Sequence, residues 1–313
     1  MQNLYYIGEE MSKKTIAVLM GGWSNEREVS LTSGGAIAKA LRDNGHTVRE
    51  VDVTRDIIKL TQDLTPKPDV AFIALHGTGG EDGVIQGVLE TMHIPYTHSG
   101  VTASAIGMDK MMSRKIFDCA GLPTPVSKVI SVSDLKKGHP MSVPYVVKPI
   151  AEGSSRGVYI IRDLSEPAAF DPNWPDSKMI LIEEFIDGRE IQVGVVGDKA
   201  IGAIEICPVQ GFYDYEAKYT DGKAVHKMPA PLSESAYAKA LDIGLKAHLA
   251  LECHGVSRSD LMYDEKKNQF YLLEINTHPG MTPLSLLPEI AAHSGMSFNQ
   301  LVDWIVENAK CHQ

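Results

Sequence analysis

The stretch TIAVLMGG, Thr15–Gly22, decides the fold class of the first part of this 313-residue chain. Its short apolar run stops at two glycines, which is typical of a strand buried on both faces in a parallel sheet. The preceding residues, 1–11, contain no such pattern, and we expect them to form a loose extension.

Outward from this strand, helix and strand patterns alternate. The elements expected are a helix that ends near Asp43 before Asn44-Gly45, a strand at His46–Val53, a helix at Ile57–Leu64, a strand at Asp69–Leu75 and a helix that ends near His93. This order predicts an N-terminal doubly wound α/β domain that binds ligands at the carboxyl ends of its strands. The loops Gly21–Glu28 and His76–Gly83 lie at such ends.

Strand patterns dominate after Pro95–Gly100, which has the composition of a linker, and after a helical stretch that ends near Cys119. We expect strands at Val126–Ser131, Tyr145–Lys148, Val158–Ile161, Met179–Ile186, Ile191–Val196, Ile201–Cys207, Val256–Met262 and Phe270–Asn276, with helices at Ala236–Leu251 and Phe298–Ala309. This part is therefore predicted to be α+β, in two smaller lobes. The domains expected are 1–98, 99–184 and 185–313.

The composition limits the partners and the compartment. The formal net charge is −10, with 30 Lys and Arg against 40 Asp and Glu, which argues against a nucleic-acid partner. There is no apolar run of roughly 18 residues and no signal-peptide pattern. The four cysteines form no CxxC pair, which favours reduced thiols. We therefore expect a cytoplasmic protein that binds neither nucleic acid nor membrane.

Two predicted strands near the C-terminus place polar side chains on one face. Arg258 and Asp260 are two residues apart on the first strand, and Glu274 and Asn276 are two apart on the second. The connection Asp264–Gln269 is typical of a hairpin turn, so pairing can gather Asp260, Glu274 and Asn276. Carboxylate and amide oxygens suit Mg²⁺ rather than zinc. A solvated sheet face with ordinary alternating charges is the alternative.

The loop that follows, Asn276–Thr282, contains a proline that restricts the backbone and a glycine that leaves it accessible. Gly280 has no side chain, so its N–H can approach a ligand closely. A tight turn without a ligand is the alternative, but it does not explain why a carboxylate and an amide lie so close by.

Lys148 ends an apolar strand, where an unused charge would be costly. The segment Glu152–Gly157 that follows is small and rich in N–H and hydroxyl donors, as expected of a loop that covers phosphates. It is neither a Walker A loop nor a dinucleotide fingerprint, because both GxxxxGK[ST] and GxGxxG are missing. The alternative is a β-hairpin with a flexible tip.

Two further segments suit a nucleotide-dependent enzyme. The strand Leu181–Ile186 leads to Glu190, and its backbone edge beside Phe185 could hold a purine while Glu190 accepts ribose hydroxyls. The aromatic segment Phe212–Tyr219 precedes an irregular polar stretch that runs to Pro231, which predicts an active-site lid. An edge strand and a surface loop are the ordinary alternatives.

Taken together, these residues resemble the D-alanine–D-alanine ligases of the ATP-grasp superfamily. The resemblance runs from Ile16 to Leu301, and its motifs are jointly specific. They are Gly21-Gly22 with Ser24–Ser30, Leu75–Gly77 with Gly80–Gly83, Met108–Lys110, Glu152–Ser155, Tyr213–Tyr219, Arg258–Asp260 and Glu274–Thr282. The resemblance implies a substrate domain of α/β type, followed by a two-lobed ATP-grasp fold with a lid in its C-terminal lobe.

The resemblance also implies site residues for ATP and metal. Lys110, Lys148 and Lys218 are expected to bind ATP, Glu183, Glu184, Phe185 and Ile186 to line the adenine pocket, and Glu190 to hold the ribose. Asp260, Glu274 and Asn276 are expected to hold two Mg²⁺ ions, for which Mn²⁺ can substitute.

The substrate and catalytic residues follow from the same motifs. Glu26 is implied to bind the amino group of the first D-alanine, in a hydrogen-bonded set with Ser154 and Tyr219, and His76 to lie near the substrates. Lys218 and Ser285 are implied to hold the carboxylate of the second substrate, and Arg258 and the Gly280 N–H to stabilise the oxyanion.

The reaction implied is the ATP-dependent joining of two D-alanine molecules through an acyl phosphate, for peptidoglycan precursor synthesis; we expect a homodimer. The nearest alternative is a ligase that adds D-lactate or D-serine. In the family, D-lactate-adding enzymes have a histidine in the lid where this chain has Lys218-Tyr219. The second alternative is a nucleotide-binding regulator without catalysis, which the presence of Lys148, Asp260 and Glu274 disfavours.

Overall fold

The computed structural model describes residues 12–153, 156–208 and 224–312. Contacts between Cα atoms divide the chain into two compact units. Unit 1 contains the residues up to Ser104, Cys253–Ser257 and the residues from Thr277 onward, and unit 2 contains Ala105–Glu252 and Arg258–Asn276. Unit 1 is therefore assembled from three separate segments of the chain, and unit 2 from two.

Unit 1 is built on a parallel sheet with β1 at its centre. The strands are β1 (Thr15–Gly21), β2 (Thr47–Val53) and β3 (Val70–Ile73), in the order β2-β1-β3. Leu19 of β1 lies opposite Val51 on one side and Ile73 on the other. The buried strand predicted at Thr15–Met20 is confirmed, whereas β3 is shorter than the predicted strand at Asp69–Leu75.

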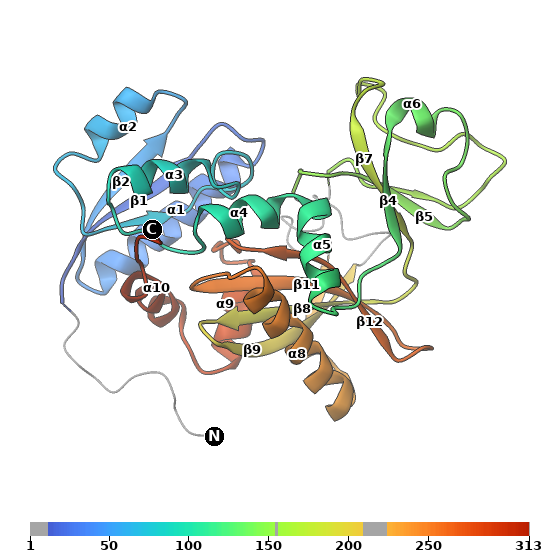
Figure 1. Cartoon of the computed structure of the whole chain (residues 1–313). Coiled ribbons are helices and arrows are strands. Elements are labelled where there is room, and N and C mark those ends of the chain that lie inside the picture. Colours follow the sequence, from blue (N-terminus) through green and yellow to red (C-terminus); the bar gives the residue numbers. More distant parts are fainter. Residues whose placement is uncertain (1–11, 154–155, 209–223, 313) are drawn as a thin grey trace. The chain divides into compact units, whose positions relative to one another are not determined.

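Helices cover both faces of this sheet (Figure 1). On one face lies α1 (Arg27–Asp43), and on the other lie α2 (Ile57–Asp63) and α3 (Val84–Thr91). Unit 1 also contains α9 (Leu286–His293) and α10 (Phe298–Glu307), which pack on each other. Ala17 and Leu19 share an apolar core with residues of α2 and α3, whereas Met20 meets α1 at Gly34. Helix α10 packs against α1. Unit 1 therefore has the doubly wound arrangement that the alternating patterns predict.

The segment Pro95–Gly100 is not the linker that its composition suggested. Tyr96 is fully buried, and its backbone forms isolated β-bridges with Ala71 and Lys310. Its hydroxyl donates a hydrogen bond to Glu90 at 2.8 Å. Proline and glycine indicate a break in regular structure, but here the break lies inside the core beside β3, where backbone pairing satisfies the buried amides.

The first sheet of unit 2 is antiparallel, in the order β4-β7-β5-β6. Its strands are β4 (Ser127–Ser131), β5 (Tyr145–Pro149), β6 (Tyr159–Ile161) and β7 (Met179–Glu184), with the short helix α6 (Val132–Leu135) after β4. Tyr145, Val147, Ile180 and Ile182 lie in the core of this sheet. All four strands lie where strand patterns predict them.

The second sheet of unit 2 has the order β10-β9-β8-β11-β12. Its strands are β8 (Arg189–Val196), β9 (Lys199–Pro208), β10 (Ala224–Lys227), β11 (Val256–Asp264) and β12 (Gln269–Asn276). Helix α8 (Glu234–Ala250) packs on β8 and β9, and α5 (Lys110–Cys119) packs on α8 and β12. Helix α4 (Val101–Met108) carries the chain from unit 1 into unit 2.

Strand β10 corrects part of the predicted lid. The sequence places Ala224–Lys227 in an irregular polar stretch, but these residues pair antiparallel with β9, with Lys227 opposite Glu205. An edge such as that of β9 offers backbone groups that a further strand can satisfy, and a polar sequence suits that new edge. The first part of the predicted lid, 212–223, lies outside the described residues.

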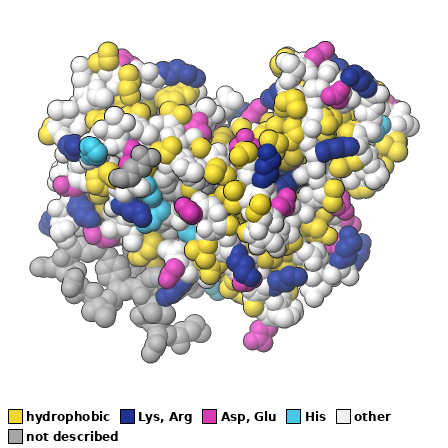
Figure 2. Space-filling view, viewed as in Figure 1, with side chains coloured by type: hydrophobic (Ala, Val, Ile, Leu, Met, Phe, Trp, Pro, Cys, Tyr) yellow, Lys and Arg dark blue, Asp and Glu magenta, His cyan; other side chains and the backbone are white. Residues whose placement is uncertain are grey.

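Within the ranges described, no helix is both long and apolar enough to cross a bilayer. On the face drawn in Figure 2, basic and acidic side chains are interspersed among apolar ones. The acidic excess of the sequence is therefore not gathered at one place on that face.

Two adjacent glycines of α1 provide a test of how this helix packs. A Cβ atom at Gly34 would lie 2.6 Å from the Cβ atom of Met20 in β1, whereas a Cβ atom at Gly35 would meet no atom within 4 Å. We expect Gly34→Ala to lower the free energy of unfolding by about 1–3 kcal/mol, because α1 must move away from β1. The matched control, Gly35→Ala, should raise it by about 0.5–1 kcal/mol. Urea denaturation measures both, and equal changes would contradict this packing.

Candidate active site

Both sheets of unit 2 line one open pocket. It contains about 860 Å³ of empty space, the solvent at its mouth included. Strands β5, β6 and β7 contribute from the four-stranded sheet, and β8, β11 and β12 contribute from the five-stranded sheet. The pocket therefore combines side chains from segments that are far apart in the sequence.

Most of the residues predicted for ATP and metal lie in this pocket. The lining includes Lys110, Lys148, Glu183, Glu184, Phe185, Ile186, Glu190, Asp260 and Glu274. Asn276 lies two residues beyond Glu274 on β12. The lining also includes Glu152 and Arg156, which belong to the predicted phosphate-covering segment Glu152–Gly157.

Three buried charged side chains form an ion group at this pocket. Lys148 Nζ lies 2.5 Å from Glu183 Oε1, and Arg114 Nη2 donates to Glu183 Oε2 at 2.8 Å. All three side chains are at most 7% exposed. Burial lowers the pKa of the Lys148 ammonium, although Glu183 acts in the opposite direction. Burial alone would raise the pKa of Glu183, but Lys148 and Arg114 hold it below its ordinary value.

The β11–β12 hairpin sets the positions of the acidic side chains. Asp260 pairs with Glu274, and Arg258 pairs with Asn276, as strand alternation predicts. Arg258 donates two hydrogen bonds to Asp260, at 2.8 and 3.1 Å, and Lys110 Nζ lies 3.2 Å from Glu274. The register shifts directly after Asp260, so both Leu273 and Glu274 line the pocket. Each carboxylate therefore faces its partner and has a cation beside it.

This arrangement fits a magnesium site. Asp260 and Glu274 are opposed across the hairpin, and Asn276 continues along the same strand. Among the described residues, no three His, Cys, Asp or Glu side chains form a metal-binding group, so the site depends on the Asn276 amide as a third donor. Mg²⁺ is commonly coordinated by one or two carboxylates, and water and substrate phosphates complete its coordination shell. The oxygen donors of Asp260, Glu274 and Asn276 match this preference.

Unit 1 brings two other predicted residues, Glu26 and His76, into one neighbourhood. Ser24 Oγ donates to the His76 carbonyl at 2.6 Å and accepts from the Glu26 N–H at 3.1 Å. Glu26 is buried, and its Oε1 lies 3.6 Å from where a Cβ atom at Gly77 would stand. The His76 ring contacts Ser33 Oγ through Nε2 and Glu81 through Nδ1, at 3.1 Å each. The two predicted ligand loops of the α/β unit therefore meet at these residues.

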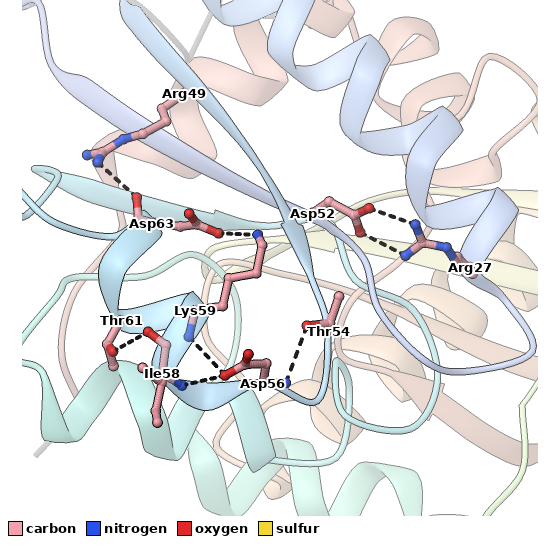
Figure 3. Close-up of polar contacts among 9 residues, drawn as sticks. All are labelled: Arg27, Arg49, Asp52, Thr54, Asp56, Ile58, Lys59, Thr61 and Asp63. Carbon is pink, nitrogen blue, oxygen red and sulfur yellow. Dashed lines mark hydrogen bonds and ion pairs between the residues drawn. The ribbon is translucent and has the colours of Figure 1, made fainter.

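Arg27 fixes the start of α1, immediately after Glu26. Its guanidinium donates to both carboxylate oxygens of Asp52, at 2.8 and 2.7 Å, and to the Gly22 carbonyl at 3.1 Å. Figure 3 shows the paired hydrogen bonds between Arg27 and Asp52, which lies near the end of β2. The Arg27 hydrogen bond holds the pKa of Asp52 below its ordinary value. The contact ties the loop that carries Glu26 to the edge of the sheet.

The loop after β12 places Gly280 beside Ser285, both of which the resemblance assigns to substrate steps. A Cβ atom at Gly280 would lie 2.8 Å from Ser285 Oγ, so a side chain there would displace Ser285. Ser285 accepts a hydrogen bond from the Thr282 N–H at 2.9 Å and stands at the N-terminus of α9 without capping it. His278 is buried in the same loop, with its ring 4.6 Å from that of His98.

The remaining predicted site residues, Ser154, Lys218 and Tyr219, lie outside the described residues. Two polar residues near the sites escaped the sequence analysis. Ser33 contacts His76 from the second turn of α1, and Arg114 contacts Glu183 from one turn beyond Lys110. Helical spacing from the known motif could have indicated Arg114, because residues four apart share a helix face.

The fold and the pocket of unit 2 define the class of protein. Two sheets that jointly line a pocket with two lysines and a facing pair of carboxylates form the arrangement of an ATP-grasp enzyme. The α/β unit at the N-terminus completes the predicted order of folds.

Comparison with known proteins supplies the family. Residues 54–99 and 119–307 match the models described as D-ala D-ala ligase N-terminus and C-terminus. A D-alanine--D-alanine ligase of Methylorubrum populi is 50% identical, over 96% of this chain and 99% of the relative. The chain belongs to the D-alanine–D-alanine ligase family.

Solved structures agree with this assignment. The D-alanine--D-alanine ligase from Bacillus anthracis, complexed with ATP, has a TM-score of 0.77 at 32% identity and covers 95% of this chain and 97% of its own. The VanG D-Ala:D-Ser ligase from Enterococcus faecalis has a TM-score of 0.77 at 26% identity, over 95% of this chain and 99% of that one.

The ion group of Lys148, Glu183 and Arg114 predicts a strong dependence of stability on Glu183. Glu183→Gln leaves two buried cations without their carboxylate, so we expect the free energy of unfolding at neutral pH to fall by about 3–5 kcal/mol. Glu184→Gln, at the neighbouring half-buried carboxylate of the same strand, is the matched control and should cost about 1 kcal/mol or less.

The pH dependence of this difference follows from the lowered pKa of Glu183. A depressed folded pKa contributes stability above the ordinary value of 4.5, and this contribution is lost as the pH falls through the folded value. The difference in free energy of unfolding between wild type and Glu183→Gln should therefore become smaller below pH 4.5. Urea denaturation from neutral to acid pH measures this difference. A difference that grows in acid would contradict the inference that Glu183 is ionised in the folded protein.

Proposed function

We propose that this protein uses ATP to join two D-alanine molecules into D-alanyl-D-alanine for peptidoglycan precursor synthesis, with release of ADP and phosphate. The observation that carries the proposal is the pocket in which Lys110 and Lys148 lie beside the facing carboxylates of Asp260 and Glu274. Cations that spread phosphate charge and oxygen ligands for Mg²⁺ are what phosphoryl transfer requires. The relatives named for this ligation support the choice of substrates.

Each part of ATP has a proposed partner in the pocket. Lys110 and Lys148 take the phosphates, together with Lys218. Glu183, Glu184, Phe185 and Ile186 line the adenine part of the pocket, and the Glu183 carboxylate also contacts Lys148 and Arg114. Glu190 takes the ribose hydroxyls, and Gln192 Nε2 orients its carboxylate by donating to it at 2.9 Å.

Asp260, Glu274 and Asn276 are proposed to hold two Mg²⁺ ions, for which Mn²⁺ can substitute. When bound, the ions would spread the negative charge that gathers on the phosphates. The chain's own contribution is orientation: the two hydrogen bonds from Arg258 fix the Asp260 carboxylate, and the Lys110 ammonium pairs with Glu274.

The amino-acid substrates are assigned to the residues of unit 1 and to the segment outside the described residues. Glu26 binds the ammonium group of the first D-alanine, with Ser154 and Tyr219 as its partners and His76 close by. The burial of Glu26 supports this role, because a buried carboxylate gains from a cationic ligand. Ser285 and Lys218 hold the carboxylate of the second D-alanine, and the free N-terminus of α9 at Ser285 favours an anion there.

The proposed reaction has two steps. The carboxylate of the first D-alanine attacks the γ-phosphorus of ATP, which gives an acyl phosphate and ADP. The neutral amine of the second D-alanine then attacks the acyl carbon, and phosphate leaves with the former acyl oxygen. Arg258 and the Gly280 N–H stabilise the oxyanion of the tetrahedral intermediate, and the lid that begins at Phe212 keeps water from the acyl phosphate.

The organisation of the protein is part of the proposal. We assign three domains, at 1–98, 99–184 and 185–313. The two separate sheets of unit 2 support the division of the ATP-binding part into two lobes. We further propose that the protein is a cytoplasmic homodimer.

Product analysis tests the identity of the second substrate. We expect ATP-dependent phosphate release with D-alanine, and dipeptide rather than ester when D-alanine and D-lactate compete at equal concentration near pH 7. Tyr219 is expected to be neutral there, since tyrosine titrates near 10, whereas a histidine titrating near 6.5 could repel the ammonium group of D-alanine. Predominant ester would favour the D-lactate alternative, and predominant use of D-serine would favour the D-serine alternative.

The metal assignment has its own test in Glu274→Gln. We expect this change to remove most of the turnover, because it removes a charged oxygen ligand, while the free energy of unfolding changes by about 1 kcal/mol or less. Glu265→Gln, at an exposed carboxylate in the turn of the same hairpin, is the control and should keep wild-type turnover. Wild-type turnover in Glu274→Gln, or full activity with all divalent ions chelated, would contradict the assignment.

A further inference from the structure

Arg114 is a buried cation beside the pocket that the proposed reaction leaves without a role. It lies four residues after Lys110 on α5, and its Nη2 atom donates to Glu183 at 2.8 Å. Glu183 in turn contacts Lys148, so Arg114 reaches the phosphate lysine through one carboxylate. Arg114 itself does not line the pocket.

The pocket poses an electrostatic problem for an anionic ligand. Its lining carries three basic side chains, Lys110, Lys148 and Arg156, but six carboxylates: Glu152, Glu183, Glu184, Glu190, Asp260 and Glu274. ATP brings several more negative charges. A carboxylate that stays uncompensated therefore weakens binding of the phosphates, the more so because a buried charge is poorly screened.

Glu183 is the carboxylate with the greatest effect on Lys148. With Lys148 as its only partner, the two side chains would form a neutral pair, and the lysine would present little net charge to a phosphate. Arg114 occupies the second carboxylate oxygen and changes the balance. Two cations against one anion leave the group with a net charge of one positive unit.

The charge of Arg114 is used at this site. Its side chain is buried, and its guanidinium donates to the Glu183 carboxylate at 2.8 Å. A buried charge is costly unless it is paired, and Glu183 is the partner that compensates it. Arg114 therefore contributes charge to this group and not packing alone.

We propose that Arg114 is a positioning residue for nucleotide binding: it neutralises Glu183, so that the positive charge of Lys148 remains available to the phosphates of ATP. The inference rests on the proposed function, since it takes ATP to be the ligand of the pocket. It assigns to Arg114 a selective effect on the phosphate chain, which an arginine that only stabilised the fold would not have.

The test compares the affinities of ATP, ADP and adenosine for the full-length protein by isothermal titration calorimetry in the presence of Mg²⁺. Arg114→Met should weaken ATP binding by about tenfold, ADP binding less, and adenosine binding hardly at all, since each phosphate lost removes part of the interaction. Arg114→Lys keeps the charge and should stay within about threefold of wild type for all three ligands. Lys115→Met removes an exposed cation from the next position of α5 and should change none of the affinities.

A double variant separates charge from structure. Arg114→Met/Glu183→Gln restores one net positive charge to the group, so its preference for ATP over adenosine should return towards that of wild type. Urea denaturation in parallel identifies any variant that has lost its fold. An equal loss of ATP and adenosine affinity in Arg114→Met, unchanged ATP affinity, or no recovery in the double variant would each overturn the proposal. If wild type binds no ATP, the proposed function itself fails.

Discussion

The register of the β11–β12 hairpin is the constraint on which the pocket of unit 2 depends. Side chains alternate along a strand, so a slip of one residue would turn Glu274 away from Asp260 and to the other face of the sheet. The register shift after Asp260 also shapes the pocket, because it lets two consecutive residues of β12, Leu273 and Glu274, line it. The same strand leads directly into the loop that contains Gly280. One pairing pattern therefore sets both the acidic pair and the start of that loop.

Much of the pocket could be predicted because its residues follow local rules. The two-residue period places Asp260 and Glu274 on one face, and an apolar strand that ends in a lysine singles out Lys148. The alternation of short strands with helices likewise predicts the doubly wound unit. These features depend on a few neighbouring residues, and a single sequence contains that information. The roles of the site residues stay predictions, and Ser154, Lys218 and Tyr219 lie outside the described residues.

What the sequence did not predict depends on contacts between distant segments. Arg114 looks like any helical arginine until β7 brings Glu183 to it. Pro95–Gly100 has the composition of a linker, yet Tyr96 is fully buried because Ala71 and Lys310 pair with its backbone. The irregular stretch assumed at Ala224–Lys227 becomes a strand because β9 offers an edge. In each case a tertiary partner overrides a local pattern, and no spacing in the sequence identifies that partner.

The β-bridge between Tyr96 and Lys310 has a consequence for synthesis of the protein. The hydrogen bond from His312 N to Glu90 spans 222 residues, and α10 must be made before it can pack on α1. On the ribosome, the parallel sheet around β1 therefore emerges early but lacks its last layer until translation has passed Lys310. All of unit 2 has been synthesised by Asn276. Unit 1 begins first on the ribosome, but its last contacts cannot form until unit 2 has been synthesised in full.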